Sequence, residues 1–585
     1  MLKSQQVIAL KGIEIKEFMN KHQMHPKKEF ESIRHIVEYA AETYGEKTAF
    51  SYRIKPSDKE KVSVSYIAFR DDVRALASEM LARGMQNRHV VVVGKMSYQF
   101  IVTYYATLLI GAVLVPLDKD WSAADLADTA KSADIDYLFI DEENASKGKE
   151  IASLCGLKTP VVLLGALGKQ SLDAMIEKGR AKFSKNPKPY CEVTFDNKQL
   201  SLLVYTSGTT GKGKGVMLST DAIIRDMADV IPYVDFSQNT VSVLPPHHTY
   251  GSSVMLIAHV MIGAEVYISD GIKYVVKELK SEKPGHLILV PLYLETFYRR
   301  IQANLRNQGK EALVKNMMKL SGFTRKATFG LMDIRKKVFA QIREAFGGEI
   351  KTIITGGAPI NQDIISFFEG IGISVLNGYG ITECAPIISV NRSRNVVKGS
   401  VGNVLDMDVV KIVEPNEDGE GEICVKGPNV MLGYYKNEQA TTEAFDEEGY
   451  FRTGDYGKLT KGGVLFITGR KKNLIILSNG KNVYPEEIEN ELISVPGVQD
   501  IVVYEGKSKR GMEHNAIVAE IFPDKEFIEK NGITDAMAYF HAYIDEYNKT
   551  AVPYKKITVL RVRSEEFPKN TLRKIMRFKI DTTID

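Results

Sequence analysis

The sequence predicts a multidomain α/β protein, in which a large N-terminal lobe of two α/β subdomains and a small β-barrel precedes a small α+β C-terminal lobe. At 585 residues the chain is too long to fold around a single hydrophobic core. In about its first two-thirds, strand-like apolar runs alternate with helical patterns, as in parallel sheets covered by helices. From about residue 399 to 468, short strands punctuated by Gly and Asp indicate an antiparallel β unit, and the residues after it carry strands and helices of their own.

Four apolar runs in the first part have the length of buried strands. They are Val90–Val93, Tyr137–Ile140, Val161–Leu164 and His286–Val290, and helical patterns such as 66–84 lie between them.

One uncharged segment, Phe100 to Leu117, is about as long as a short membrane span. Gly111 and Pro116 interrupt it, and several Thr and Tyr residues make it only moderately apolar. We therefore expect a buried helix that ends near Gly111, followed by a strand over 112–115.

The composition excludes several classes of protein. A net charge of +4 is too small to indicate a nucleic-acid partner. Four scattered cysteines without a CxxC pair fit a reducing compartment and argue against a zinc site or a disulfide framework. The N-terminus lacks the long apolar stretch of a secretory signal, so a cytoplasmic location is expected.

The stretch 299–343 is strongly basic, with twelve Lys/Arg and two Asp/Glu. Ile334, Val338, Ile342 and Phe346 recur at every fourth position within and just after it, which predicts an amphipathic helix. The stretch could attract an anionic membrane surface, giving peripheral contact with the inner membrane, or bind a polyanionic cosubstrate. A solvated basic face over an ordinary apolar stripe explains the same pattern.

A loop rich in glycine and hydroxyl side chains occupies 205–216, between two apolar runs. A strand, a loop and a second strand are the simplest prediction. Glycines let backbone N–H groups converge on an anion, while the hydroxyls and Lys214 add donors and charge, so nucleotide phosphates fit here. The P-loop of nucleoside triphosphatases does not fit, because Gly215 replaces the required Ser/Thr and a strand follows. A plain surface loop is the alternative.

A second motif, Asn377-Gly378-Tyr379-Gly380-Ile381-Thr382-Glu383, has flanking glycines that permit a sharp turn. Tyr379 could stack on a base, Thr382 could bind phosphate, and Glu383 could hold Mg²⁺, which prefers oxygen ligands together with phosphates. A dinucleotide fingerprint is excluded because Glu383 replaces the third glycine.

Taken together, these motifs resemble the adenylate-forming superfamily, which includes acyl-CoA synthetases, luciferases and peptide-synthetase adenylation modules. The first loop matches the pattern YTSGTTGxPKGV except for Gly213, where proline is usual. Six ordered motifs carry the resemblance from about residue 201 to the C-terminus. The string that begins at Gly469-Arg470-Lys471-Lys472-Asn473 looks most like long-chain fatty acid–CoA ligases.

The resemblance implies a nucleotide site in which Asp455 binds the ribose, Arg470 contacts the nucleotide, and Gly356-Gly357-Ala358-Pro359 lies along adenine. It also implies Mg²⁺ ligation by Glu383 and Thr206. The nucleotide-binding residues expected on this basis are Thr206, Ser207, Gly208, Thr209, Thr210, Gly211, Lys214, Gly356, Gly357, Ala358, Pro359, Asn377, Gly378, Tyr379, Gly380, Thr382, Asp455, Arg470 and Lys574.

Four residues are expected to be catalytic by the same resemblance: Thr382, Glu383, His248 beside the acyl site, and Lys574 in the C-terminal segment. Arg573 stands where glycine usually precedes that lysine. The apolar run 254–263 after His248 could line an acyl tunnel, although a histidine in such a place can equally be part of the core.

The same resemblance implies a domain plan with a mobile small lobe. The expected large lobe is 1–469, divided into α/β subdomains 1–200 and 201–398 and the β unit 399–469. Lys472 is the expected hinge residue within 470–472, and 473–585 is the expected mobile lobe.

The implied reaction uses ATP, Mg²⁺ and CoA. A fatty acid attacks ATP to give acyl-AMP and pyrophosphate, and the acyl group then passes to the CoA thiol. Three alternatives stay open: an acyl carrier protein as acceptor, another hydrophobic carboxylic acid as substrate, and a peptide-synthetase module, against which the lack of a carrier domain before Asp585 counts. A regulatory nucleotide-binding protein without catalysis is disfavoured, because the expected charged positions are intact.

Overall fold

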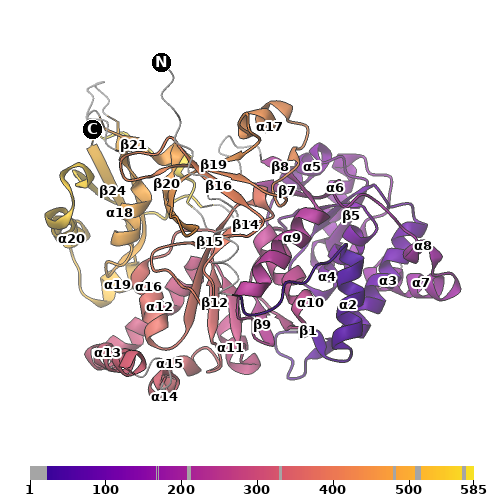
Figure 1. Ribbon diagram of the computed structural model, residues 1–585, viewed down its shortest axis with the longest axis horizontal. Helices are drawn as coiled ribbons and strands as arrows, with labels where there is room; N and C mark the ends of the chain where they lie inside the picture. Colours follow the sequence, from indigo (N-terminus) through magenta and orange to yellow (C-terminus); the bar gives the residue numbers. More distant parts are fainter. Residues whose placement is uncertain are drawn as a thin grey trace.

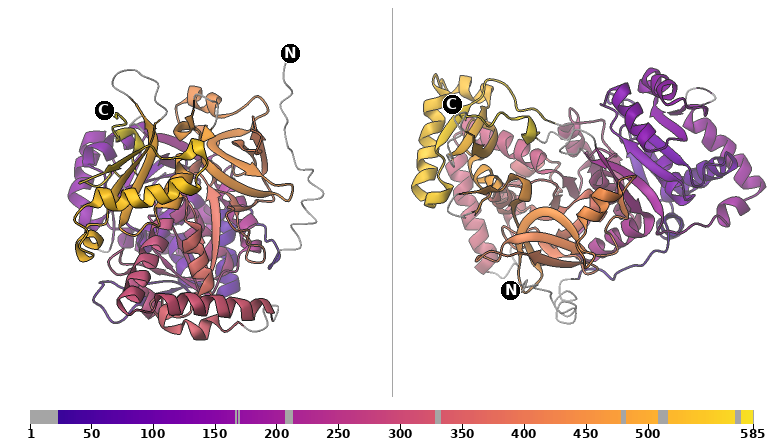
Figure 2. Two further views of the ribbon diagram at one scale, coloured as in Figure 1. Left: turned by 90° about the vertical axis from the view of Figure 1, so that its left-hand side faces the viewer. Right: turned by 90° about the horizontal axis from the view of Figure 1, so that it is seen from above.

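The computed structural model describes residues 23–165, 168, 170–206, 213–327, 333–477, 482–507, 516–569 and 575–584. Helices and sheets alternate in a large lobe that extends across Figure 1, and a smaller C-terminal lobe lies at its left. The view from above in Figure 2 shows the N-terminal sheet and the C-terminal lobe at opposite ends, with the β unit between them. The predicted α/β architecture with a small α+β lobe is confirmed.

A seven-stranded sheet forms the N-terminal end of the molecule, and five of its strands are parallel (Figure 1). Val90 and Val92 of β3 face the core that contains α3 and α4, while Val91 and Val93 face the core that contains α5 and α6. This alternation follows from the two-residue period of a strand. In sheet order the strands are β18 (Gly433–Tyr434), β8 (Lys214–Ser219), β7 (Leu200–Thr206), β4 (Val113–Leu117), β3 (His89–Val93), β5 (Tyr137–Asp141) and β6 (Val162–Leu164).

Serine residues begin six of the helices in this lobe. Each serine Oγ accepts a hydrogen bond from a backbone N–H three residues later, which satisfies a donor that the first helical turn leaves unpaired. The capped helices are α2 (Ile33–Tyr44), α3 (Tyr66–Ala82), α4 (Tyr98–Leu109), α5 (Ala123–Ser132), α7 (Leu172–Lys185) and α9 (Thr220–Val230). The sheet is also covered by α6 (Ala145–Cys155), and α8 (Lys188–Cys191) follows α7.

The uncharged segment 100–117 is a buried helix followed by a buried strand, as the sequence predicts. The helix α4 ends just before Gly111, whose φ of +72° stops it, and β4 follows. Among the helices that the structure describes, none has both the length and the apolar character required to cross a bilayer.

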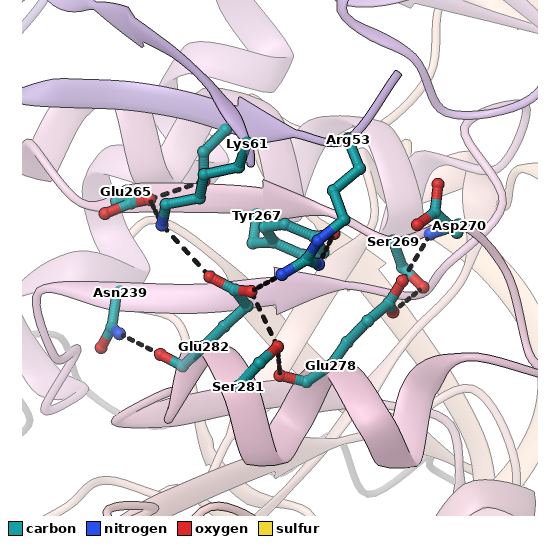
Figure 3. Close-up of polar contacts among 11 residues, drawn as sticks. Arg53, Lys61, Asn239, Glu265, Tyr267, Ser269, Asp270, Glu278, Ser281 and Glu282 are labelled. Atoms are coloured by element: carbon teal, nitrogen blue, oxygen red, sulfur yellow. Dashed lines mark hydrogen bonds and ion pairs between the residues drawn. The ribbon is translucent and has the colours of Figure 1, made fainter. Parts of the chain in front are cut away.

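A four-stranded sheet joins the N-terminal residues to a later part of the chain. Its order is β2 (Val62–Ser65), β1 (Thr48–Tyr52), β10 (Glu265–Ile268) and β9 (Asn239–Ser242). Around Glu282, at the end of α11 (Val275–Glu282), charged groups reinforce this contact (Figure 3). Arg53 Nη2 lies 2.8 Å from Glu282 Oε1, and Lys61 Nζ lies 3.1 Å from Glu282 Oε2. The β1–β2 hairpin is thus tied both to β10 and to α11.

A nine-stranded sheet carries most of the residues expected in the nucleotide site. Its first three strands are parallel, so their carboxyl ends share one edge, and the rest are antiparallel and contain the predicted β unit. In order they are β11 (His286–Leu289), β12 (Thr352–Thr355), β13 (Ser374–Gly380), β14 (Ile387–Val390), β15 (Gly402–Val404), β20 (Val464–Arg470), β19 (Phe451–Leu459), β17 (Gly421–Lys426) and β16 (Val409–Val413).

The helix predicted from Ile334 to Phe346 is wrong as a single element. Two short helices, α14 (Arg335–Val338) and α15 (Ala340–Glu344), replace it, and the buried Phe339 between them leaves helical geometry at φ −105° and ψ 22°. Arg343 is also buried, and its guanidinium donates to the carbonyls of Gly372 at 2.9 Å and Ile350 at 2.6 Å. The charge pattern therefore did not mark a solvated position at Arg343, because its guanidinium satisfies buried backbone groups, whereas Lys336 and Lys337 are exposed.

The longer helices of this region are α12 (Pro291–Asn307), α13 (Glu311–Ala327) and α16 (Gln362–Gly370), which surround the second hydrophobic core. In Figure 1, α13, α14 and α15 lie along the lower edge of the molecule.

The small lobe is built on a three-stranded sheet and two longer helices with their own core. Its elements are the hairpin β21 (Ile475–Ile476) and β22 (Asn482–Val483), the sheet β23 (Val498–Gly506), β24 (Ala516–Pro523) and β25 (Val559–Val562), and the helices α18 (Pro485–Leu492), α19 (Lys525–Lys530) and α20 (Ala536–Thr550). The predicted limit at residue 200 falls at the start of β7, inside the seven-stranded sheet. The domain limits and the mobility of the small lobe remain predictions.

Candidate active site

The predicted strand, loop and strand at the phosphate motif are present as the antiparallel pair β7 and β8. Thr206, the last residue of β7, pairs with Lys214, the first of β8, and its Oγ1 donates to the Lys214 carbonyl at 3.4 Å. Ser207, Gly208, Thr209, Thr210 and Gly211 lie outside the described residues. The described ends of the hairpin thus place Thr206 and the exposed Lys214 side by side at the base of this loop.

A cluster of three side chains stands beside the hairpin. The Tyr434 hydroxyl donates to Glu383 Oε1 at 2.9 Å, and Lys214 Nζ lies 4.7 Å from the centre of the Tyr434 ring. Burial and the neighbouring carboxylate raise the pKa of Tyr434, so its hydroxyl stays a donor. We call Lys214, Tyr434 and Glu383 the Glu383 cluster. Sequence reasoning predicted Lys214 and Glu383 but missed Tyr434, which the two-residue strand β18 brings next to β8.

Backbone contacts fix the segment that carries Thr382 and Glu383. These residues form a single turn, η4 (Thr382–Cys384), which packs against β8, and the Met431 N–H donates to the Glu383 carbonyl at 2.8 Å. Gly380 precedes the turn where a Cβ would lie only 2.0 Å from the Pro386 carbonyl oxygen, so the approach requires glycine.

A second cluster joins β13 to the β unit. The Tyr379 hydroxyl donates to Asp455 Oδ2 at 2.7 Å, and Arg470 Nε lies 3.2 Å from Asp455 Oδ1. Asp455 and Arg470 are directly paired residues of β19 and β20. Burial raises the pKa of Asp455, although the charge of Arg470 and the hydrogen bond from Tyr379 oppose the rise. We call Tyr379, Asp455 and Arg470 the Asp455 cluster.

The residues expected along adenine follow β12, next to the second motif. Thr355 pairs with Asn377 on the neighbouring strand, and a Cβ on Gly356 would lie 3.0 Å from the Gly378 carbonyl oxygen. Gly357 has a φ of +83° and turns the chain outward, and it is exposed together with Ala358 and Pro359. Carboxyl ends of neighbouring parallel strands are a common place for ligands in α/β sheets.

The segment of His248 also reaches this sheet. The Tyr250 hydroxyl donates to the Ile354 carbonyl at 3.3 Å, just before the end of β12. His248 is half-buried, with its ring centre 4.2 Å from that of His247, and His247 Nε2 lies 3.6 Å from Asp118 Oδ2. Burial lowers the pKa of His247, against the attraction of Asp118.

The apolar run expected to line an acyl tunnel is a buried helical element. Residues Tyr250–Ala258 form a π-helix (η3), continued by α10 (His259–Ile262), and 254–261 are almost fully buried in the main core. π-helical segments often occur at functional sites. The tunnel itself remains a prediction.

Lys472, the expected hinge residue, lies in the turn η5 (Lys471–Asn473) between β20 and β21. Its neighbour Lys471 pairs with Glu422 of β17, with Nζ and Oε2 2.7 Å apart. Lys574 lies outside the described residues. The described residues on either side of this gap, Lys569 and Ile575, form an isolated antiparallel β-bridge.

The donor set fits Mg²⁺ bound together with phosphates rather than a protein-only metal site. Among the described residues, no group of three or more His, Cys, Asp or Glu side chains could hold a metal ion. The structure offers the Glu383 carboxylate and the Thr206 hydroxyl near the phosphate hairpin, both oxygen donors of the kind Mg²⁺ accepts, and phosphates and water usually complete its shell.

The amino-acid sequence is similar to those of AMP-binding enzymes and of ligases that act on long-chain fatty acids. A family model described as "AMP-binding enzyme" matches residues 37–435. The chain is 28% identical over 456 residues to the long-chain-fatty-acid–CoA ligase FadD15 of Mycobacterium bovis, covering 74% of each chain. It is 26% identical over 571 residues to the chloroplastic long-chain-fatty-acid–[acyl-carrier-protein] ligase AEE15 of Arabidopsis thaliana, covering 85% of this chain and 77% of that one.

Solved structures give the same fold. ATP-bound MatB from Rhodopseudomonas palustris superimposes with a TM-score of 0.71 at 23% identity, covering 94% of this chain and 98% of that one. The O-succinylbenzoate coenzyme A synthetase MenE of Bacillus subtilis, in complex with ATP and a magnesium ion, gives a TM-score of 0.67 at 20% identity, covering 93% and 98%.

Proposed function

Because this chain belongs to the AMP-binding enzyme family, we propose that it activates a fatty acid with ATP and transfers the acyl group to the thiol of CoA. One observation carries the proposal: the Glu383 cluster and the Asp455 cluster, built from distant parts of the chain, meet at the end of β13, where η4 with Glu383 directly follows the strand that carries Tyr379. The first offers an ammonium group for phosphates and a carboxylate for Mg²⁺, and the second offers a carboxylate that can accept hydrogen bonds from ribose hydroxyls.

The chemistry explains why a nucleotide is required. A carboxylate is a poor electrophile, because oxide would have to leave when a thiol attacks it. Attack of the carboxylate oxygen on the α-phosphorus of ATP forms a new P–O bond and releases pyrophosphate. The thiol sulfur then attacks the carbonyl carbon of the acyl-adenylate, AMP leaves, and the thioester remains.

In this proposal the Glu383 cluster and the hairpin bind the triphosphate. Lys214 offers an ammonium group to the β- and γ-phosphates, and hydroxyl and backbone donors of the loop bind the same oxygens. Glu383 and Thr206 would hold Mg²⁺, which supplies charge neutralisation at the phosphates when bound. Thr382, beside Glu383, would donate to phosphate. These groups act by positioning and electrostatic stabilisation.

The Asp455 cluster binds the nucleoside. A buried carboxylate held by Tyr379 and Arg470 can accept hydrogen bonds from two ribose hydroxyls. The segment 356–359, exposed from Gly357 onward, lies at the sheet edge where adenine would extend, and Asn377 begins the neighbouring segment. The Tyr379 ring stacks on the base while its hydroxyl keeps its hydrogen bond to Asp455.

The small lobe completes the site in two orientations. Lys574 brings positive charge to the carboxylate and α-phosphate during adenylation, and rotation about Lys472 then brings the β21–β22 hairpin to the thiol. The support for this is the resemblance of 568–575 and 469–483 to the corresponding family segments.

The names of the relatives support a long-chain fatty acid as the substrate. FadD15 is a long-chain-fatty-acid–CoA ligase, which favours CoA as acceptor. AEE15 is an acyl-carrier-protein ligase, so a carrier protein is the second candidate acceptor. His248, two residues before Tyr250, whose hydroxyl reaches the Ile354 carbonyl of β12, would lie beside the acid. Another hydrophobic carboxylic acid is the alternative substrate.

The test is pyrophosphate release measured over fatty acids of increasing length, without acceptor, with CoA and with acyl carrier protein. The proposal predicts fatty-acid-dependent release and AMP formation that CoA accelerates. Acceleration by carrier protein alone would transfer the proposal to the second acceptor. ATP binding without any fatty-acid-dependent pyrophosphate would overturn it.

A further inference from the structure

Helix α13 presents large apolar side chains to solvent. Leu313, Leu320 and Phe323 are 56%, 65% and 70% exposed. Single exposed apolar residues are common on protein surfaces, but several on one face of one helix are informative. At about 100° per residue, these three lie within about 80° of one another around the helix axis.

The opposite side of α13 is fixed to the protein. Val314 and Ser321 are buried, and Met317 and Met318 pack against the second hydrophobic core. Met318 fits so closely over α16 that a Cβ on Gly370 would meet its methyl group. The exposed face is therefore not left over from a poorly packed helix, because the helix already has a complete buried side.

Positive charge lies directly beside the apolar face. Lys315 and Lys319 are exposed, and neither has an ion-pair partner among the residues that the structure describes. Lys319 lies about 40° beyond Phe323 around the helix, and Lys315 about 40° further. By sequence, the helix carries four Lys/Arg and one acidic residue, Glu311.

The basic residues of 299–343 therefore have different environments in the folded protein. Arg343 is buried on backbone carbonyls, Arg335 pairs with Asp333, and Lys336 pairs with Glu349 at 2.8 Å. Lys315 and Lys319 lie on α13, which is at the lower edge of the molecule in Figure 1.

We infer that α13 is a docking surface for an anionic membrane. A helix with Leu and Phe on one face and lysines beside them lies in the plane of the headgroups, with its apolar side chains at the acyl boundary. The lysines attract anionic lipids, and their long aliphatic stems allow the ammonium groups to reach the headgroups while the apolar face is inserted. An acidic protein would match the lysines but would leave Leu313, Leu320 and Phe323 without an apolar partner.

Sedimentation of the full-length protein with lipid vesicles tests the inference. Vesicles of phosphatidylcholine with phosphatidylglycerol should bind the protein at low salt, and pure phosphatidylcholine vesicles should bind it much less. Lys315→Glu with Lys319→Glu should weaken binding by about tenfold or more. Leu320→Ser with Phe323→Ser should weaken it at both low and high salt, because the apolar contribution is not screened.

Matched control variants lie on α6, at the opposite end of the molecule in Figure 1. Leu154 is an exposed leucine, and Lys149 is an exposed lysine on the same helix. Leu154→Ser and Lys149→Glu should bind vesicles like the wild type. Equal loss in the α6 and α13 variants, no binding by the wild type, or binding by α13 variants at wild-type strength would each overturn the inference. If the α13 variants lost binding to acyl carrier protein but kept their binding to vesicles, the inference would also be overturned.

A second measurement does not depend on losing affinity. The chain has one tryptophan, Trp121, so a Phe323→Trp variant adds a single reporter. Its emission should shift to the blue when anionic vesicles are added, while the emission of Leu154→Trp should not move. A Phe323→Trp signal that is unchanged by vesicles to which the protein binds would place the contact elsewhere and refute the assignment.

Discussion

Replacing Tyr434 with phenylalanine removes one hydroxyl and leaves the ring beneath Lys214. The lost atom donates to Glu383 Oε1 at 2.9 Å, and Tyr434 is only 8% exposed. A hydrogen bond to a charged group contributes about 1.5 to 3 kcal/mol, and water can partly replace the hydroxyl at the half-buried Glu383. We therefore expect a loss of about 1 to 2 kcal/mol in the binding of Mg²⁺ with ATP, which is about 5- to 30-fold in affinity.

The neighbouring residue supplies the control. The Tyr435 hydroxyl also donates to a carboxylate, Asp134 Oδ2 at 2.6 Å, but it has no contact with Glu383. Titration calorimetry with ATP and Mg²⁺, and the Mg²⁺ dependence of pyrophosphate release, should change for Tyr434→Phe and stay constant for Tyr435→Phe. Excess Mg²⁺ should restore much of the Tyr434→Phe rate. Identical Mg²⁺ dependence in both variants would refute the role of Tyr434, provided that their melting temperatures match.

Four further outcomes are expected. Asp455→Ala should raise the KM for ATP in pyrophosphate release by about 10- to 100-fold, because two ribose hydroxyls lose a charged acceptor; an unchanged KM would remove the ribose from this cluster. Lys574→Ala should abolish adenylate formation but spare thioester formation from supplied acyl-adenylate, and equal loss of both half-reactions would contradict this division. Arg53→Ala should lower the free energy of unfolding in urea by about 1 to 3 kcal/mol, which is more than Lys61→Ala should, because the Arg53–Glu282 pair is the more buried (Figure 3). A larger loss in Lys61→Ala would contradict this ranking. The buried pair His259 and His286 should make the free energy of unfolding depend on pH.

The two imidazoles form one hydrogen-bond chain. Ser237 N–H donates to His286 Nδ1 at 3.2 Å, so the proton of His286 lies on Nε2, which faces His259 Nε2 at 2.8 Å. His259 Nδ1 then donates to the Val254 carbonyl at 3.2 Å. Burial lowers the pKa of His259 to about 4 and that of His286 well below its usual value.

The unfolded chain therefore binds more protons than the folded chain below about pH 6.5, and this contribution to stability is lost as pH falls toward 4. For His259 alone, the free energy of unfolding falls by about 3 kcal/mol between pH 6.5 and 4. Urea unfolding of the wild type and of His259→Leu with His286→Leu should show a smaller pH slope in the double variant between pH 6.5 and 4. Equal slopes would mean that the pair does not titrate on unfolding.

The sequence predicted the elements that depend on local pattern. Short β-branched runs such as Val90–Val93 became strands, and α4 ended just before Gly111, as expected. Motifs at the ends of strands, such as 356–359 after β12 and 377–383 across the end of β13, came together because parallel strands share an edge.

Long-range contacts could not be predicted in the same way. Tyr434 reaches Glu383 only because β18 adds two residues to β8 from more than two hundred positions away, and its own sequence looks like an ordinary loop. The charged residues of 299–343 looked alike in sequence, but the fold buries Arg343 and exposes Lys315 and Lys319. Arg343 can be buried because other segments of the chain present the carbonyls of Ile350 and Gly372 to its guanidinium, and the local sequence does not reveal these contacts.

Isotope exchange between ATP and pyrophosphate, with a long-chain fatty acid, Mg²⁺ and no thiol, tests most directly whether the two clusters form one adenylation site. We predict exchange that requires the fatty acid and falls steeply in both Glu383→Ala and Asp455→Ala. Exchange that persists in either variant, or conversion of ATP to ADP and phosphate, would contradict the account.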